Sequence, residues 1–186
     1  MDIASATDED LTALVLGTQD AEAFGELVRR NQVIVRGLLL RMAADAATAD
    51  DVAQEAFLHA FERLDQFKGT GTFRAWLCRV AYTKMLMLLR KRKSDAKMQD
   101  AFAESWFVRE TSTDAQGNTM DLSRALSMLT EAERAAVVLS YASDFSHAEI
   151  SQALNLPLGT VKSHVNRGRG KLRKLLGAQQ VDPDEH

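Results

Sequence analysis

Apolar residues recur every three to four positions along most of this chain, the spacing that places them on one face of an α-helix. The pattern predicts a short helix over 10–17, longer helices over 21–41 and 50–64, and another from 73 to about 93. Residues 48–51, Thr-Ala-Asp-Asp, are expected to cap the third of these and place acids in its first turn. Four such helices can pack into one small domain.

The 50–64 helix has two distinct faces. Phe57, Phe61 and Leu64 are predicted to point inward. The opposite face then presents acidic and amide groups with one apolar neighbour: Asp51, Gln54, Glu55 and Leu58. This composition suits a protein partner and equally suits a solvated helix face, so the pattern alone leaves both interpretations open.

Periodicity weakens after residue 93 and returns near residue 121. We therefore expect a domain over 8–93, a flexible linker over 94–120, a second domain over 121–177 and an acidic tail over 178–186. The second domain should begin with helical residues 121–140, where Thr130 and Glu133 match a capping box. A short helix within the linker would hold three aromatic residues: Phe102, Trp106 and Phe107.

The segment 146–176 predicts two helices joined by a tight turn. Ser146 and Glu149 form a capping box for the first helix, residues 155–157 end it, and Thr160 is expected to cap the second. An apolar stripe follows the second helix: Val161, Val165, Gly168, Leu172 and Leu175. Its other faces are purely cationic or polar: Lys162, Ser163, His164, Asn166, Arg167, Arg169, Lys171, Arg173 and Lys174. Such a helix suits a DNA major groove, and close packing would explain the glycine at 168.

Charge is strongly segregated along the chain. The net charge is only −3, yet residues 67–97 hold nine bases and one acid, and 157–177 hold six bases and no acid. The segments 1–66 and 98–156 are acidic. This arrangement indicates two separate anion-binding surfaces, each next to an acidic part of the protein.

The first basic segment, 67–93, interleaves cations with aromatic rings beside the Gly-Thr loop 67–72. Cationic side chains with stacking rings suit single-stranded nucleic acid, because every base offers a π-face. The loop lacks the Gly-Lys-Ser/Thr ending of a phosphate-binding P-loop. Trp76 and Phe73 taken singly would be ordinary core residues, and only their combination with the nine bases of residues 67–97 indicates a binding surface.

Composition excludes several other classes. No run of eighteen apolar residues exists and the N-terminus is acidic, so we expect no membrane span or secretory signal and a cytoplasmic protein. Cys78 is the single cysteine and is expected to be a small helix residue. The four histidines have no ligand-like spacing, so we expect no metal and no cofactor. We expect an all-α, non-enzymatic protein.

Three motifs in this order resemble the extracytoplasmic-function (ECF) sigma factors of bacteria: DDVAQEAFLHAFERL, FKGTGTFRAWLCRVAYTKMLMLLRKRK and the G-T-V-K-S-H helix. The resemblance implies a sigma-2-like four-helix domain, a flexible linker and a sigma-4-like helix-turn-helix domain. It implies binding of the RNA polymerase clamp coiled coil by Asp51, Gln54, Glu55 and Leu58. The linker acids would thread the polymerase RNA path, and an anti-sigma factor would hold the protein inactive.

The same resemblance assigns two DNA-binding sets. The first would contact the melted −10 element: Phe67, Lys68, Gly69, Thr70, Gly71, Thr72, Trp76, Arg79, Thr83, Met87 and Arg90. The second would read the −35 element: Thr160, Lys162, Ser163, His164, Asn166, Arg167 and Arg169. This chain has Thr83 where the family often has Asn, and His164 where it usually has Arg.

Two other functions remain open from the residues. A dimeric helix-turn-helix regulator would need a phosphoacceptor or ligand pocket in the N-terminal half and would bind a palindrome without polymerase. A helical adaptor that binds only protein would show no salt-dependent affinity for DNA.

Overall fold

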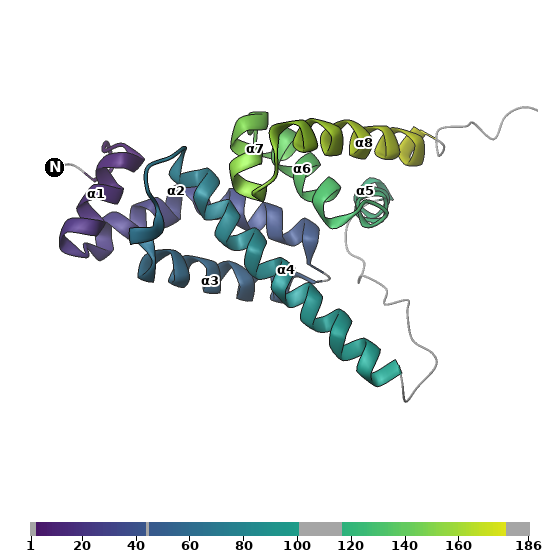
Figure 1. Cartoon of the computed structure of the whole chain (residues 1–186), viewed down its shortest axis with the longest axis horizontal. Helices are drawn as coiled ribbons and strands as arrows, with labels where there is room; N and C mark the ends of the chain where they lie inside the picture. The colour runs from purple at the N-terminus through teal and green to yellow at the C-terminus, as the bar shows by residue number, and fades with distance from the viewer. Residues whose placement is uncertain (1–2, 44, 101–116, 178–186) are drawn as a thin grey trace, which may run out of the picture. The chain divides into compact units, whose positions relative to one another are not determined.

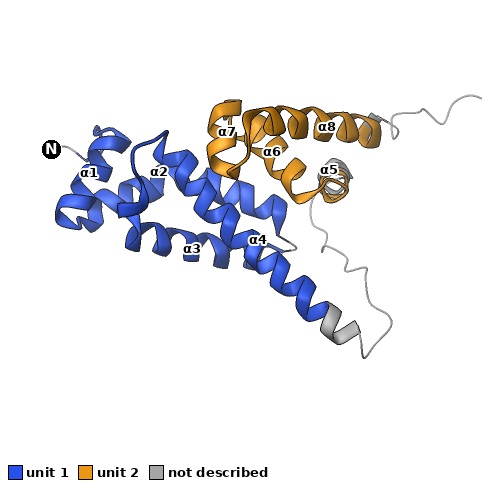
Figure 2. Ribbon diagram, in the orientation of Figure 1, with its two compact units in different colours: residues 1–111 blue, residues 112–186 orange. Residues whose placement is uncertain are grey.

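The computed structural model describes residues 3–43, 45–100 and 117–177, and every regular element in these ranges is a helix (Figure 1). The all-α fold class is therefore confirmed. The chain divides into two compact units, Met1–Thr111 and Ser112–His186 (Figure 2).

In its described residues, the first unit consists of helices α1 (Asp8–Thr18), α2 (Ala21–Met42), α3 (Ala46–Glu62) and α4 (Phe73–Asp100), with the short 3₁₀ turn η1 (Leu64–Gln66). Helix α2 packs against α1, α3 and α4, and α3 also packs against α4. The core contains the fully buried Leu11, Leu27, Leu38, Leu77 and Met85. The apolar stripes of four helices thus close around one core.

Two helix boundaries in this unit differ from the prediction by four residues or more. Helix α3 begins at Ala46 because Asp45, and not Thr48, is its cap: the Asp45 carboxylate accepts bonds from Thr48 N at 2.7 Å and Thr48 Oγ1 at 2.9 Å. Helix α4 continues to Asp100, beyond the predicted end near Lys93. No glycine or proline follows Lys93 within the helix, so nothing local stops it there.

The second unit contains α5 (Gly117–Ser127), α6 (Glu131–Ala142), α7 (His147–Leu154) and α8 (Leu158–Gly177). Helix α8 packs against α5, α6 and α7. The predicted capping boxes at Thr130 and Ser146 are both present. Because Thr130 starts a new helix, the segment predicted as helical over 121–140 is divided between α5 and α6.

The turn of the helix-turn-helix is formed by Asn155, which adopts a left-handed conformation (φ 53°) and closes α7. Helix α8 starts immediately after Pro157, and the Val161 N–H donates to the Pro157 carbonyl at 3.0 Å. Thr160 therefore lies inside the first turn of α8, and its predicted role as the cap is wrong.

Some expectations fall outside the described residues: the linker helix with Phe102, Trp106 and Phe107, most of the linker acids, and the tail 178–186. Among the described helices, none combines the length and apolarity needed to cross a bilayer. Within the same ranges, no three His, Cys, Asp or Glu side chains cluster as metal ligands would.

Cys78 is completely buried in α4, and burial raises the pKa of its thiol to about 12. Because the thiolate is the reactive form, we expect the native chain to resist iodoacetamide in mildly alkaline buffer and to react readily in concentrated urea. Mass spectrometry of the alkylated protein measures this. Rapid labelling of the folded chain would contradict the buried position.

Candidate functional site

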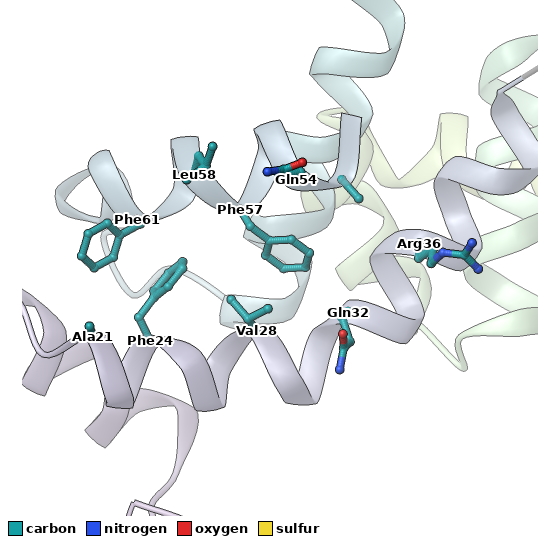
Figure 3. A pocket seen from close by; sticks show the side chains of 10 residues that line it. Ala21, Phe24, Val28, Gln32, Arg36, Gln54, Phe57, Leu58 and Phe61 are labelled. Atoms are coloured by element: carbon teal, nitrogen blue, oxygen red, sulfur yellow. The ribbon is translucent and has the colours of Figure 1, made fainter. Parts of the chain in front are cut away.

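An apolar groove of about 520 Å³ runs between α2 and α3 (Figure 3). The rings of Phe24 and Phe61 lie 4.9 Å apart across it. Leu58 is 58% exposed, although it is surrounded by apolar neighbours. The full lining is Ala21, Phe24, Val28, Gln32, Arg36, Ala53, Gln54, Phe57, Leu58 and Phe61. An exposed apolar groove makes this surface a candidate partner site.

The prediction that Phe57 and Phe61 face the core is wrong, because small residues occupy that face of α3. Ala49, Ala56 and Ala60 are fully buried and allow α3 to approach its neighbours closely. The larger rings lie at the edge of this contact: Phe57 is partly buried and Phe61 is 38% exposed. Both rings therefore line the groove.

The four predicted partner-binding residues of α3 are exposed on one helix face, but their neighbours differ. Gln54 and Leu58 line the groove. Glu55 instead forms an ion pair with Lys84 of α4 at 2.7 Å. Asp51 is exposed to solvent.

The α2 side of the groove was missed from the sequence. Its members are Ala21, Phe24, Val28, Gln32 and Arg36. Arg36 bridges to α3 by an ion pair with Asp50, with Nε 2.6 Å from Oδ1. The hydrogen bond from Arg36 holds the pKa of the Asp50 carboxyl below its usual value. The only sequence signal was the four-residue spacing of Phe24, Val28 and Gln32, which also fits a core stripe.

Three aromatic rings gather at the start of α4. Phe67 lies 5.8 Å from Phe73 and 5.6 Å from Trp76, measured between ring centroids, and Phe73 lies 5.8 Å from Trp76. Phe73 is buried, whereas Phe67 and Trp76 are only partly covered. Phe73 thus acts as a core support for two rings that reach the surface.

The loop before α4 is exposed from Lys68 to Thr72. Gly69 and Gly71 have φ angles of 69° and 98°, which side chains other than glycine rarely adopt. Thr72 Oγ1 accepts the Ala75 N–H at 3.2 Å and so caps α4. The glycines therefore shape an open loop that is attached firmly to the helix at Thr72.

Beyond the aromatic rings, one face of α4 is open to solvent. Arg79, Thr83, Met87 and Arg90 are all exposed and are spaced by four, four and three residues, so they share this face. Met87 is 63% exposed, an unusual position for an apolar side chain between cations.

Helix α8 turns Val161, Val165 and Gly168 inward. At Gly168, a Cβ atom would lie 2.5 Å from Val137 Cγ2, so the predicted close packing is confirmed. At Gly170, no atom of the described ranges lies within 4 Å of the corresponding position.

The predicted −35 set lies on the remaining faces of α8. Lys162, Asn166, Arg167 and Arg169 are exposed. Thr160, Ser163 and His164 are partly buried, and His164 Nδ1 lies buried with no hydrogen-bond partner among the described residues. The helix therefore presents cations and one amide outward, with smaller polar groups at its edges.

The sequence matches two family models, Sigma-70 region 2 over residues 27–95 and Sigma-70 region 4 over residues 119–172. It is also 30% identical over 169 residues to the ECF RNA polymerase sigma factor SigW of Bacillus subtilis, covering 84% of this chain and 90% of SigW. The chain belongs to the ECF sigma factors. The resemblance first seen in its three motifs is thus confirmed.

Two solved sigma factor structures share the fold. CnrH in complex with the cytosolic domain of CnrY is 27% identical, with a TM-score of 0.70 over 92% of this chain and 97% of CnrH. RpoE of Bartonella quintana in complex with the anti-sigma factor NepR is 24% identical, with a TM-score of 0.72 over 84% of this chain and 98% of RpoE.

As an ECF sigma factor, this protein recognises promoters for RNA polymerase and acts in transcription initiation. A sigma factor is a transcription factor and not an enzyme. Family membership decides against the dimeric regulator and the protein-only adaptor.

Proposed function

We propose that this sigma factor divides its work among three surfaces: the α2–α3 groove binds polymerase, the exposed face of α4 with its loop binds the melted −10 element, and α8 reads the −35 element. On this proposal, residues 8–93 form the sigma-2-like domain and 121–177 the sigma-4-like domain. The apolar groove carries the argument most strongly, because the described residues leave it uncovered beside the acidic helix α3.

The polymerase surface combines apolar and polar groups. Leu58, Phe57 and Phe61 offer apolar area, and Gln54 and Asp51 offer hydrogen-bonding and charged groups beside it. A helical partner such as the clamp coiled coil fits a groove between two helices. Glu55 takes a lesser part, since its carboxylate is already paired with Lys84.

The −10 surface supplies the two chemistries that a single strand needs. Phe67 and Trp76 are partly exposed rings for stacking, while Arg79 and Arg90 attract the phosphates. The open loop with Gly69 and Gly71 leaves room for a base turned out of the stack. Lys68, Thr70 and Thr72 border this space, and Thr83 and Met87 contact the strand further along α4.

The −35 surface is the outward side of α8. Arg167 and Lys162 are suited to guanine and Asn166 to adenine, with Ser163 able to contact a base or a phosphate. Thr160, His164 and Arg169 flank these residues along the groove walls. Together these side chains form the surface of α8 that enters the major groove.

We expect Arg167→Ala and Lys162→Ala to reduce promoter-specific transcription by roughly tenfold or more each, because one base contact contributes about 1–3 kcal/mol of discrimination. Binding to core polymerase should be unchanged, since neither residue touches the α2–α3 groove. Run-off transcription and core-polymerase titration measure the two properties. Arg63→Ala removes an exposed cation outside both DNA faces and is the matched control.

Equal transcription by the Arg167 variant and the wild type would refute the assignment of α8. The promoters themselves are found by transcribing genomic fragments with reconstituted holoenzyme and mapping the start sites. A chain that starts no transcript with core polymerase would refute the three-surface proposal.

We further propose that an anti-sigma factor holds the protein inactive. The relative CnrH was solved with another protein, the cytosolic domain of CnrY, which supports control by protein capture. Because RNA polymerase works in the bacterial cytoplasm, we place the action of this sigma factor there too.

A further inference from the structure

One cation of α8, Lys171, is paired with a carboxylate of the neighbouring helix α6. Lys171 Nζ lies 2.6 Å from Glu133 Oε2 of α6. The Glu133 side chain is only 5% exposed and that of Lys171 is 44% exposed. The pair thus joins a buried carboxylate to a cation that would otherwise belong to the DNA-facing charge of α8.

The same carboxylate also takes part in the N-terminal capping box of α6. Glu133 Oε2 accepts the Thr130 N–H at 3.1 Å, and the Glu133 N–H donates to Thr130 Oγ1 at 3.3 Å in the capping box. One side chain therefore links the first turn of α6 to the second half of α8.

A second contact lies one helical turn away on both helices. Gly168 precedes Lys171 by three residues, and Val137 follows Glu133 by four, so each pair shares one helix face. The Gly168 backbone approaches Val137 so closely that a Cβ would lie 2.5 Å from its methyl group. A close steric contact and an ion pair together determine how α8 lies on α6.

The charge state of the pair is well defined. Burial raises the pKa of Glu133, but the hydrogen bonds from Lys171 and Thr130 outweigh burial and leave the pKa below its usual value. Glu133 is therefore ionised at neutral pH, and Lys171 neutralises it.

We propose that Glu133 is a positioning residue for promoter recognition: through its ion pair with Lys171 it sets the placement of α8 in the major groove and withdraws Lys171 from phosphate binding. The proposal rests on the proposed function of α8 as the −35 reader. Arg167 and Lys162 then meet their bases because the far half of the helix is held on α6.

The test uses holoenzyme assembled from core polymerase and the full chain. Its probes are a duplex selected from a random pool by the wild-type holoenzyme and a scrambled duplex of the same composition. Affinity for each is measured against salt concentration, because each phosphate contact contributes about 0.9 to the slope of log K against log salt. Arg169→Met serves as the reference for loss of an exposed cation at the groove wall and should lower the slope by about 0.9.

The double variant Glu133→Gln with Lys171→Met removes both charges, so it avoids leaving a buried carboxylate unpaired, and glutamine keeps the cap. We expect it to keep the wild-type slope but to lose about tenfold in preference for the selected duplex, the worth of one displaced base contact. Glu133→Gln alone releases the Lys171 charge and should increase the slope by about 0.9. Circular dichroism confirms folding of each variant.

A slope lowered in the double variant as much as in Arg169→Met would show that Lys171 binds phosphate, and would overturn the proposal. An unchanged preference for the selected duplex would do the same, since the pair would then be merely structural. If Arg169→Met itself leaves the slope unchanged, α8 does not lie along the DNA phosphates, and the proposed function of α8 fails together with this inference.

Discussion

Replacing Leu58 with Asp should abolish tight binding of core polymerase while leaving the fold intact. Leu58 is 58% exposed, so the free protein tolerates a carboxylate there. In the complex, the same carboxylate would be buried among Phe57, Phe61 and the partner without a counter-charge. Burying an uncompensated charge costs about 3–5 kcal/mol, a loss of roughly 10²- to 10⁴-fold in affinity. Fluorescence titration of core polymerase with labelled sigma factor measures the change.

Val33 provides a matched control for this experiment. It is 76% exposed on α2 and does not line the groove. Val33→Asp places the same new charge on the same unit and should bind polymerase as the wild type does. If Leu58→Asp also bound normally, the groove would not be the polymerase surface.

A methyl group added at Gly168 should destabilise the second unit, whereas the same change at Gly170 should stabilise it. Alanine is favoured over glycine in a helix by about 0.5–1 kcal/mol, and Gly170 has open space to accept it. At Gly168 the new Cβ would meet Val137 Cγ2 at 2.5 Å, and such overpacking costs about 1–3 kcal/mol. Because both changes share the helix preference, the difference between the two variants isolates the clash.

Thermal unfolding of the full chain, followed by circular dichroism, reports the result. Each kcal/mol corresponds to roughly 4–8 °C in a unit of this size. Shortening Val137 to Ala in the Gly168→Ala background should recover part of the loss, because it removes the opposing methyl groups. Equal midpoints for the two alanine variants would mean that Val137 moves aside freely and that the close contact is unimportant.

Local signals in the sequence predicted most of the second unit. The Thr130 and Ser146 capping boxes are reciprocal pairs of bonds within four residues, so they form wherever the helix starts. The stripe of Val161, Val165 and Gly168 follows from helical periodicity alone. Thr160 misled the prediction because a threonine resembles a cap, whereas the chain already turns into α8 after Pro157.

The groove could not be predicted because it depends on packing between helices distant in sequence. Periodicity marks Phe57 and Phe61 as apolar positions but does not say whether they or the alanines of α3 make the closest contact. The structure shows that the alanines do, and the rings are left at the edge. The Glu55–Lys84 pair likewise joins residues 29 positions apart, which no local pattern reveals.

The exposed aromatic rings between α2 and α3 also affect the tendency of the free protein to aggregate. Protein made in excess of core polymerase leaves this apolar groove exposed to other copies of the chain, and exposed apolar surfaces promote self-association. Matching the synthesis of this protein to the supply of core polymerase therefore limits its self-association. Co-expression with core polymerase should yield less aggregated protein than expression of the sigma factor alone.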